Sequence, residues 1–358
     1  MAEKTGPYFI NGIGIISPQR TFDPENFLSE INEYHNNVLT CITPEFKAYI
    51  NPIQMRRLSR MLRIGLSAAT ICIRDAQIKS PDGIITATGY GFLEETAKFL
   101  NEVLNQSEKQ LTPTYFMQST SNALAGLVAL TFKCMGFNNT YASKGFGMEN
   151  ALIDGMMQLN ENPSANLLIG SYDEAAEVQY KASIRANHFK VESINNLKLF
   201  ETKTKGSIQG EGAAFFLLSA TASPTTWCSI RDVHMVYKPT PNQLHDEVQN
   251  FLKKNNTKDT EVDVVINGAS GDIDHDVLIN ELINNTVPES FEIRFKHLSG
   301  EYSTSTSFAI WLGASILKKQ EIPVAVRLQP QRNTKGMDTI LVINHYMGKI
   351  FTFILMTR

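Results

Sequence analysis

Residues 138–155 read Asn-Asn-Thr-Tyr-Ala-Ser-Lys-Gly-Phe-Gly-Met-Glu-Asn-Ala-Leu-Ile-Asp-Gly. The segment 139–143 has the composition of a short β-strand, and small or apolar residues recur at helical spacing from Phe146 onward. A sharp turn from a strand into a helix exposes one side chain, and the helix N-terminus stabilises an anion, so such turns often hold a nucleophile. Here the turn carries Gly145, which has no side chain. This absence is the main functional clue, and its meaning depends on the rest of the chain.

Composition and charge exclude several classes of protein. The 358 residues suffice for one large domain or two fused ones, and 42% hydrophobic with 19% charged residues is ordinary for a soluble globular protein. A net charge of -3 gives no reason to expect nucleic acid or an anionic membrane as partner. The four cysteines form no C-x-x-C pair, which argues against a zinc site or a redox dithiol. The longest apolar stretch, Ala123–Phe132, is too short to span a bilayer, and we expect a cytoplasmic protein without a metal.

Strand and helix patterns alternate along the chain in two similar halves. In the first half, the patterns predict strands at residues 8–16, 83–89, 139–143, 165–170 and 211–219, and helices at 55–76, 92–104, 123–134 and from 146 onward. In the second half, they predict strands at residues 228–236, 262–268, 291–295, 339–345 and 349–356, with a long helix at 304–318. Such alternation favours a doubled α/β unit. We expect one compact unit with halves at residues 1–224 and 225–358.

Several stretches, taken in order along nearly the whole chain, carry a family resemblance. They are Gly12-Ile13-Gly14-Ile15-Ile16-Ser17-Pro18, the Arg-containing segment 55–69, the segment 89–100, Gly170-Ser171-Tyr172-Asp173-Glu174 and Gly210-Glu211-Gly212-Ala213-Ala214. Together they resemble the β-ketoacyl-acyl-carrier-protein synthases of the thiolase superfamily. The resemblance implies an α/β fold of the thiolase type, in which duplicated βαβαβ halves form a layered α-β-α-β-α architecture.

The chemistry of that family uses one Cys and two His residues. The Cys at the strand–helix turn takes the acyl chain as a thioester, and the His residues help to decarboxylate a malonyl thioester and stabilise the enolate. The spacing from Gly170 places Gly145 at the Cys position. Ala269, in the run Asn-Gly-Ala-Ser-Gly, stands at the first His position, and Glu301 stands at the second. Lys296, which precedes the second His in the family, is retained.

Three departures at the three catalytic positions resemble a non-condensing member of the family, known as a chain-length factor. Such proteins pair with an active synthase and help to shape the cavity for the growing chain. The turn Lys144-Gly145-Phe146 is similar to that of synthase-like proteins in aryl-polyene and related polyene pigment pathways. The resemblance implies an active ketosynthase subunit as partner in a heterodimer, or a second copy in a homodimer. It also implies an acyl carrier protein that supplies its phosphopantetheine arm, and no cofactor of the chain's own.

The resemblance also places an interface and a tunnel. The strand with Thr140 and Tyr141 corresponds to the one that pairs across the dimer axis in the family. Tyr115, Phe116 and Met117 correspond to a segment beside that interface, where the acyl tunnel of the active subunit ends. One interpretation is that a bulky side chain there closes the tunnel and so limits chain length. The other is that these three side chains only pack the dimer core.

The sequence leaves a second function open, that of a stand-alone enzyme on acyl thioesters. A decarboxylase or an acyltransferase that works without a Cys would need other groups, and Glu301 and His275 are the candidates. If Glu301 is buried, it needs a cationic or hydrogen-bonding partner, for which Lys296 is suited. The Lys–Glu pair is then either structural or a surviving acid/base pair. His297, beside Lys296, is more often a surface or packed histidine.

Two further motifs are weaker. Ser143 lacks the G-x-S-x-G elbow of serine hydrolases, because Tyr141 holds the first Gly position. Asp272, Asp274 and Asp276 imitate the start of a calcium loop, but the required Gly and the closing Glu are absent. A solvated loop is therefore the favoured interpretation of these three carboxylates.

Overall fold

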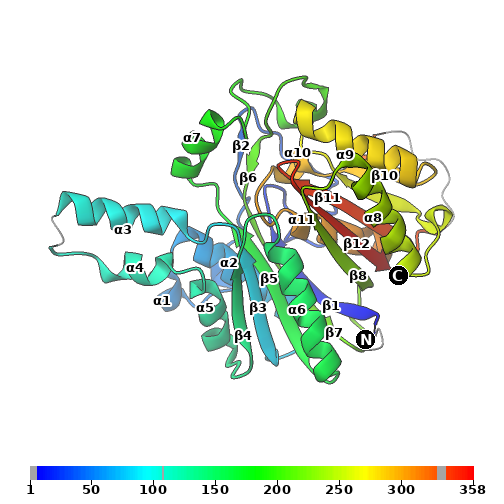
Figure 1. Cartoon of the computed structure of the whole chain (residues 1–358). Helices are drawn as coiled ribbons and strands as arrows, with labels where there is room; N and C mark the ends of the chain where they lie inside the picture. Colours follow the sequence, from blue (N-terminus) through cyan, green and yellow to red (C-terminus); the bar gives the residue numbers. More distant parts are fainter. Residues whose placement is uncertain (1–5, 107–108, 329–335) are drawn as a thin grey trace.

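The structure is a computed structural model that describes residues 6–106, 109–328 and 336–358. Ten strands pair side by side in the order β10-β9-β11-β12-β8-β1-β7-β5-β3-β4 (Figure 1). Their bounds are β1 Tyr8–Ile16, β3 Gly83–Thr88, β4 Asn138–Ala142, β5 Asn166–Asp173, β7 Gly212–Ser219, β8 Cys228–Tyr237, β9 Val264–Gly268, β10 Phe291–Arg294, β11 Thr339–Tyr346 and β12 Ile350–Thr357. Two short strands, β2 (Val38–Leu39) and β6 (Gln209–Gly210), pair separately.

The two halves of the described chain have the same strand topology. In the first half, β1 pairs antiparallel with β7, and β7 pairs antiparallel with β5. Strand β5 then pairs parallel with β3, and β3 pairs parallel with β4. In the second half, β8 pairs antiparallel with β12, and β12 pairs antiparallel with β11. Strand β11 then pairs parallel with β9, and β9 pairs parallel with β10. The halves join where β1 pairs antiparallel with β8, from Tyr8 opposite Ile230 to Ile10 opposite Cys228. This repeat confirms the doubled α/β unit, while the boundary between residues 224 and 225 stays a prediction.

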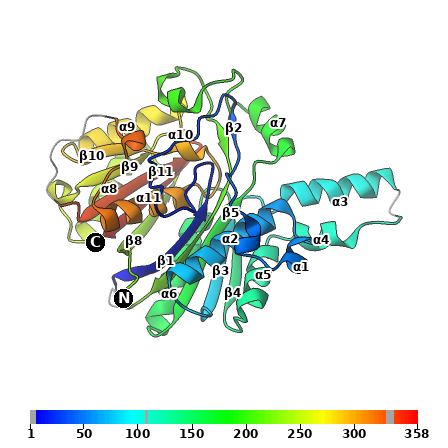
Figure 2. The same cartoon turned by 180° about the vertical axis from the view of Figure 1, so that it is seen from behind.

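Helices form three layers around the two sets of strands. The outer helices α2 (Arg60–Asp75) and α5 (Ala123–Phe132) pack on the first set, and α8 (Pro241–Lys254) and α9 (Ile273–Thr286) pack on the second. Between the sets lie α6 (Gly147–Glu161) and α11 (Thr306–Lys319), whose apolar residues share one core with both. The layered α-β-α-β-α architecture is therefore confirmed (Figures 1 and 2).

The remaining helices lie around this body. They are α1 (Pro52–Met55), α3 (Leu93–Asn105), α4 (Pro113–Ser119), α7 (Glu177–Arg185) and α10 (Lys296–Ser299), with short 3₁₀ helices at Phe46–Ala48, Asn196–Glu201, Asp259–Glu261 and Val324–Val326. Helices α3 and α4 pack on each other and project from the body as an arm, as Figures 1 and 2 show. In the described part of the chain, no helix has the length and apolar character needed to cross a bilayer.

The single helix predicted at residues 55–76 is wrong. Helix α1 ends at Met55, and α2 begins at Arg60. Ser59 separates them because its backbone is extended and its hydroxyl accepts a hydrogen bond from the N–H of Leu62, the arrangement of an N-cap. The apolar spacing continues across this break, so periodicity alone did not reveal it.

Candidate functional site

The candidate site lies where the parallel strands of both halves end. Gly145 follows β4 and Asp173 ends β5 in the first half, while Ala269 follows β9, Lys296 follows β10 and Tyr346 ends β11 in the second. In open α/β sheets, functional groups gather at the carboxyl ends of parallel strands. In this structure, the carboxyl ends of the parallel strands of the two halves face the same region. The sequence-predicted positions of both halves therefore belong to one neighbourhood, which the following contacts define.

Gly145 leaves no room for a side chain. Its φ of +76° lies in the left-handed region, which favours glycine. A Cβ added to Gly145 would lie 2.8 Å from Cδ1 of Tyr346 and 2.9 Å from Cδ1 of Ile350, which is closer than real contacts allow. Gly145 thus supplies no nucleophile to the turn before α6, and Tyr346 and Ile350 from the second half lie where its side chain would be.

Lys296 and Glu301 form a buried ion pair. The Lys296 ammonium donates to Oε2 of Glu301 at 2.6 Å and to the backbone oxygen of His345 at 2.7 Å. The Ser305 hydroxyl donates to the other carboxylate oxygen of Glu301 at 3.3 Å. Both charged residues are buried, so each compensates the desolvation of the other. The contact expected from the sequence is present, and its geometry suits a structural pair because the ammonium already has two acceptors.

Ala269 belongs to the packed core rather than to an open site. Its side chain is fully buried among apolar residues of the outer layer, and its N–H donates to Oδ1 of Asn267 at 2.8 Å. The loop that follows is held by Asp276, whose carboxylate accepts from the N–H groups of Ser270 and Gly271, both at 2.7 Å. The position that the resemblance assigns to the first His therefore offers no acid or base of its own.

His345 and Tyr346 were missed by sequence reasoning. The ring of His345 accepts a hydrogen bond at Nδ1 from the N–H of Gly348 and donates from Nε2 to Asp276, at 3.1 and 3.3 Å. Burial, with the nearby charge of Lys296, lowers the pKa of His345, so this histidine is a neutral ring fixed in one tautomer. The topology could have revealed both residues, because they end β11, which runs parallel to β9. The carboxyl ends of these two strands therefore lie at the same edge of the sheet.

The cavity at this place is very small. It encloses about 20 Å³, close to the space of a single water molecule. Its walls are Gln179, His188, Phe189, Ser207, Ser270, Asp272, His275, Glu301, Tyr302, Tyr346 and Met347. His275 thus borders the site, where its Nδ1 lies 3.6 Å from Oδ2 of Asp272. An acyl thioester has no room beside Glu301 in this arrangement.

The weaker sequence motifs have local structural roles. Asp272 caps α9 by accepting from the N–H of Asp274 at 2.9 Å, and Asp274 pairs with Lys205 at 2.7 Å. Among the described residues, no group of three or more His, Cys, Asp or Glu side chains could hold a metal ion. His297 is buried and donates from Nε2 to the backbone oxygen of Ala325 at 2.8 Å. Burial lowers the pKa of His297 to about 4, so it packs as a neutral ring.

The residues assigned to the interface lie at the other edge of the first set of strands. β4 is the last strand in the order, so one side of it pairs with no other strand of the described chain. The Thr140 hydroxyl lies 2.8 Å from that of Thr86, and the Tyr141 hydroxyl donates to Asp154 at 3.0 Å. Both side chains therefore contact their own chain. The groups of β4 that remain for pairing with a partner are the backbone N–H and C=O groups of its open edge.

Helix α4 carries the three residues assigned to the tunnel. Phe116 is 57% and Met117 68% exposed, whereas Tyr115 is half-buried with its ring 5.9 Å from the ammonium of Lys98. Other exposed large apolar residues lie nearby on the arm, on α5 and before β4: Leu100, Leu104, Leu130, Met135 and Phe137. We call this set, with Phe116 and Met117, the arm–edge surface. So much exposed apolar surface on one end of a protein is typical of an interface.

Comparison with known proteins gives the fold a family context. Residues 36–199 match the family model described as the N-terminal domain of β-ketoacyl synthases. The fold is similar to that of the ishigamide ketosynthase/chain length factor, with a TM-score of 0.77, 13% identity, and 98% of each chain covered. It is equally similar to a ketosynthase (ApeO) in complex with its chain length factor (ApeC) from Xenorhabdus doucetiae, with a TM-score of 0.77, 13% identity, and 100% of this chain and 99% of that chain covered.

A third structure contains a carrier protein. It is a type II PKS acyl-carrier protein in complex with its ketosynthase, AntDE:AntF, with a TM-score of 0.71, 14% identity, and 98% of this chain and 99% of that chain covered. No curated protein sequence matches this chain. At identities this low the structural matches establish the fold, which is the thiolase-type fold of ketosynthases.

Proposed function

We propose that this chain, whose residues 36–199 match the β-ketoacyl synthase N-terminal domain, is a non-condensing partner of an active ketosynthase, similar to a chain-length factor. The observation that carries the proposal is the turn at Gly145, which has a left-handed backbone and lies against Tyr346 and Ile350. A condensing enzyme needs a nucleophile at this turn to take the acyl chain. Here the nucleophile is absent, and the space that it would need is filled.

The other two catalytic positions support the same function. Ala269 is packed into the core, and Glu301 is bound to the buried Lys296. A decarboxylase or acyltransferase of the non-Cys type would need space for a thioester beside Glu301 or His275. The cavity of about 20 Å³ argues against that second function.

The proposed partner contacts follow from the surface. The open edge of β4 and the arm–edge surface supply backbone hydrogen-bonding groups and apolar area, which are the two components of a large, obligate interface. The partner is an active ketosynthase in a heterodimer, with a second copy of this chain as the alternative. An acyl carrier protein brings the growing chain on its phosphopantetheine arm, and Phe116 and Met117 limit the length of the chain in the active subunit's tunnel.

Co-expression with a ketosynthase that retains Cys and both His residues tests this function. We expect the chain alone to condense no malonyl and acyl thioesters, and the two chains together to purify as one heterodimer with condensing activity. Turnover by the chain alone, well above that of a heat-inactivated sample, would contradict the proposal. Elution of the two chains as separate species would contradict it as well.

The tunnel role has its own experiment within that heterodimer. Phe116→Ala removes an exposed ring from α4, and we expect the partner to make longer carrier-bound products, which mass spectrometry measures. Leu104→Ala is the matched control, because Leu104 is also an exposed apolar residue of the arm, at 78% exposure. Unchanged product length in an intact Phe116→Ala heterodimer means that the ring only packs the interface.

A further inference from the structure

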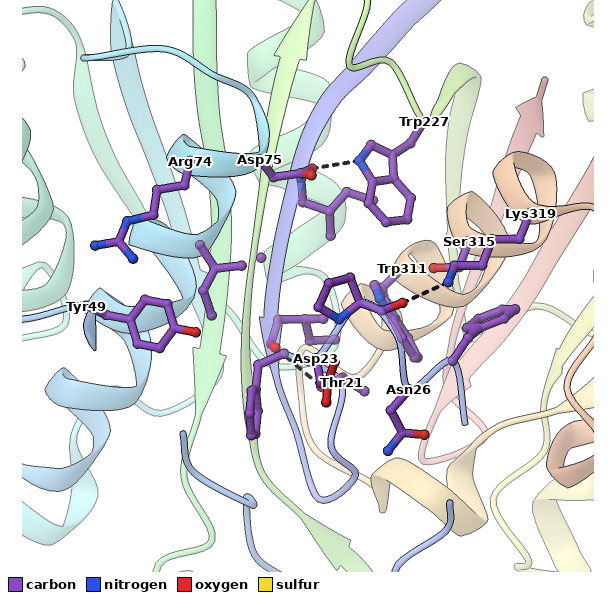
Figure 3. A pocket seen from close by; sticks show the side chains of 17 residues that line it. Thr21, Asp23, Asn26, Tyr49, Arg74, Asp75, Trp227, Trp311, Ser315 and Lys319 are labelled. Carbon is purple, nitrogen blue, oxygen red and sulfur yellow. Dashed lines mark hydrogen bonds between the residues drawn. The ribbon is translucent and has the colours of Figure 1, made fainter. Parts of the chain in front are cut away.

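A second cavity lies apart from the candidate site, at the junction of the two halves. It has a volume of about 390 Å³, which is within the range of small-molecule sites. Residues of the first half, among them Ile13 and Asp75, meet Trp227, Trp311 and Ser315 of the second half around it (Figure 3). It shares no lining residue with the small cavity beside Glu301. Its occupant is therefore a separate question from the function proposed above.

The walls of this junction cavity are aromatic. Five rings line it, from Phe22, Phe27, Tyr49, Trp227 and Trp311. The side chains of Ile13, Ile15 and Ile71 add aliphatic surface between them. Flat aromatic surfaces favour a ligand that has a ring of its own, because stacked and edge-on ring pairs are attractive beyond the burial of their area.

One end of the cavity offers hydrogen-bond donors and a positive charge. Ser315 is only 1% exposed, yet its hydroxyl takes part in no hydrogen bond with the described residues. Four residues later, on the same face of α11, the Lys319 ammonium donates to the backbone oxygen of Pro24 at 2.8 Å. An ammonium group has three N–H donors, and Lys319 uses one of them for Pro24. No carboxylate of the described chain pairs with the Lys319 ammonium, so this group retains donors for an anion.

Another side of the cavity offers an acceptor. The carboxylate of Asp75 accepts at Oδ2 from the indole N–H of Trp227 at 2.7 Å and from the N–H of Ile13 at 2.9 Å. These two bonds fix the carboxylate, and its other oxygen accepts no hydrogen bond from the described residues. Figure 3 shows Asp75 and Trp227 on one side of the cavity, with Ser315 and Lys319 on another. Arg74 is directed to the margin, where it donates to the backbone oxygen of Ala48 at 2.8 Å.

We propose that the junction cavity binds a small molecule with an aromatic body, an anionic group at one end and a hydroxyl group at the other. The anionic group contacts Ser315 and Lys319, the ring lies between the tryptophans, and the hydroxyl donates to Asp75. The aromatic walls and the Lys319 ammonium carry this assignment most directly, because rings attract a ring and the ammonium has donors beyond the one that it gives to Pro24. The carboxylate of Asp75 excludes an anion from its own end by repulsion.

The chain provides its own reporter for this binding. It contains two tryptophans, Trp227 and Trp311, and both line the cavity. Tryptophan fluorescence of the full chain therefore reports on this site, and an increase in melting temperature gives a second readout because ligands stabilise the folded state that binds them. Three probes differ in one group each: 3-(4-hydroxyphenyl)propionate, 3-phenylpropionate without the hydroxyl, and tyramine with a cation in place of the anion.

We expect 3-(4-hydroxyphenyl)propionate to bind most tightly of the three, and tyramine most weakly. Lys319→Gln, which keeps a donor for Pro24 but removes the charge, lowers the affinity for this anion about tenfold, as does Ser315→Ala. Lys253→Gln is the matched control, since Lys253 is an exposed cation in the last turn of α8 that does not line the cavity, and this variant leaves the affinity unchanged. The proposal is overturned if no probe gives a saturable signal, if tyramine binds tightest, or if Lys253→Gln weakens binding as much as Lys319→Gln.

Discussion

The function proposed above depends at the residue scale on the turn at Gly145, which has no side chain at the position that the resemblance assigns to the nucleophile. The sequence shows only that Gly145 has no side chain. The structure adds that Tyr346 and Ile350 occupy the space where a side chain of residue 145 would lie. At the position that the family resemblance assigns to the second His, Glu301 instead forms a buried ion pair with Lys296. Under the proposed function, a thiol introduced at Gly145 therefore does not suffice for condensation.

Gly145→Cys tests this conclusion. We expect the variant to be destabilised by about 1–3 kcal/mol, since the new side chain overpacks against Tyr346 and adopts a left-handed backbone. We expect no acyl-enzyme when it is incubated with an acyl thioester, which intact-protein mass spectrometry detects. Tyr346→Ala is itself destabilising because Tyr346 is buried, but the double variant should be less destabilised than the sum of the two single variants, as measured by urea unfolding. Stoichiometric acylation of the introduced thiol with unchanged stability would show that the turn is open after all.

Glu174, directly after β5, makes the stability depend on pH. Burial raises the pKa of Glu174 from 4.5 to about 8, and the carboxylates of Glu94, Glu211 and Glu95 also raise it, against a hydrogen bond from the N–H of Glu94. Between pH 4.5 and 8 the unfolded chain loses this proton while the folded chain keeps it, so the stability decreases as the pH rises through that window.

Glu174→Gln removes that dependence and retains an oxygen for the N–H of Glu94, which lies 2.7 Å from the carboxylate. We expect the variant to be more stable than the natural chain at pH 9, and the difference between the two to shrink toward pH 5. Urea midpoints of both proteins at several pH values measure this. A difference that stays constant from pH 5 to 9 would mean that the carboxyl group is ionised in the folded state throughout.

At the scale of elements, the sequence predicted most strands closely but missed part of the helical structure. β1 has the predicted bounds, and β4, β9 and β10 differ from prediction by one or two residues, since composition and flanking turns mark strand ends. Helix α4 was not predicted, because its seven residues are too few to show a period. The predicted site positions are close in the structure, whereas the filling of the site by Tyr346 depends on a contact between halves that no local pattern encodes.

The edge strand β4 gives the clearest prediction at this scale. The N–H of Ser143 donates to β3 at Thr88, and Phe137 accepts from Ile84 on the same strand, so alternate residues between them face β3. Thr140 therefore directs its N–H to the open edge, and that N–H donates to the Asn139 side chain at 2.9 Å. Thr140→Pro removes a donor from the edge without removing one from the β3–β4 ladder.

We expect Thr140→Pro to fold and to lose its partner, which size-exclusion chromatography of the co-expressed chains measures. Thr140→Val is the matched control: it also loses the hydroxyl contact with Thr86 but keeps the N–H, and it should elute as a dimer. A Thr140→Pro chain that elutes as the same dimer, with unchanged stability, would show that β4 is not at the interface.

At the scale of the whole molecule, the two repeated halves form one structure. The central core contains residues of both strand sets and of α6 and α11, and β1 pairs with β8. Asp173 of the first half accepts from Thr88 and Gly89 of its own half and, at 2.9 Å, from the N–H and the hydroxyl of Thr304 in the second. A shared core and buried cross-half hydrogen bonds make the unfolding of one half costly for the other.

We therefore expect the chain to unfold in one cooperative step, although it is built from two repeats. Trp227 and Trp311, the two tryptophans, both lie in the second half, so tryptophan fluorescence follows that half while far-ultraviolet circular dichroism follows the helices of both. The two signals should give the same urea midpoint. A fragment of residues 1–224 should fail to fold, because it exposes the core face that α11 and β8 cover. Two separate midpoints, or a folded fragment, would mean that the halves are independent domains and that the junction cavity between them can open without global unfolding.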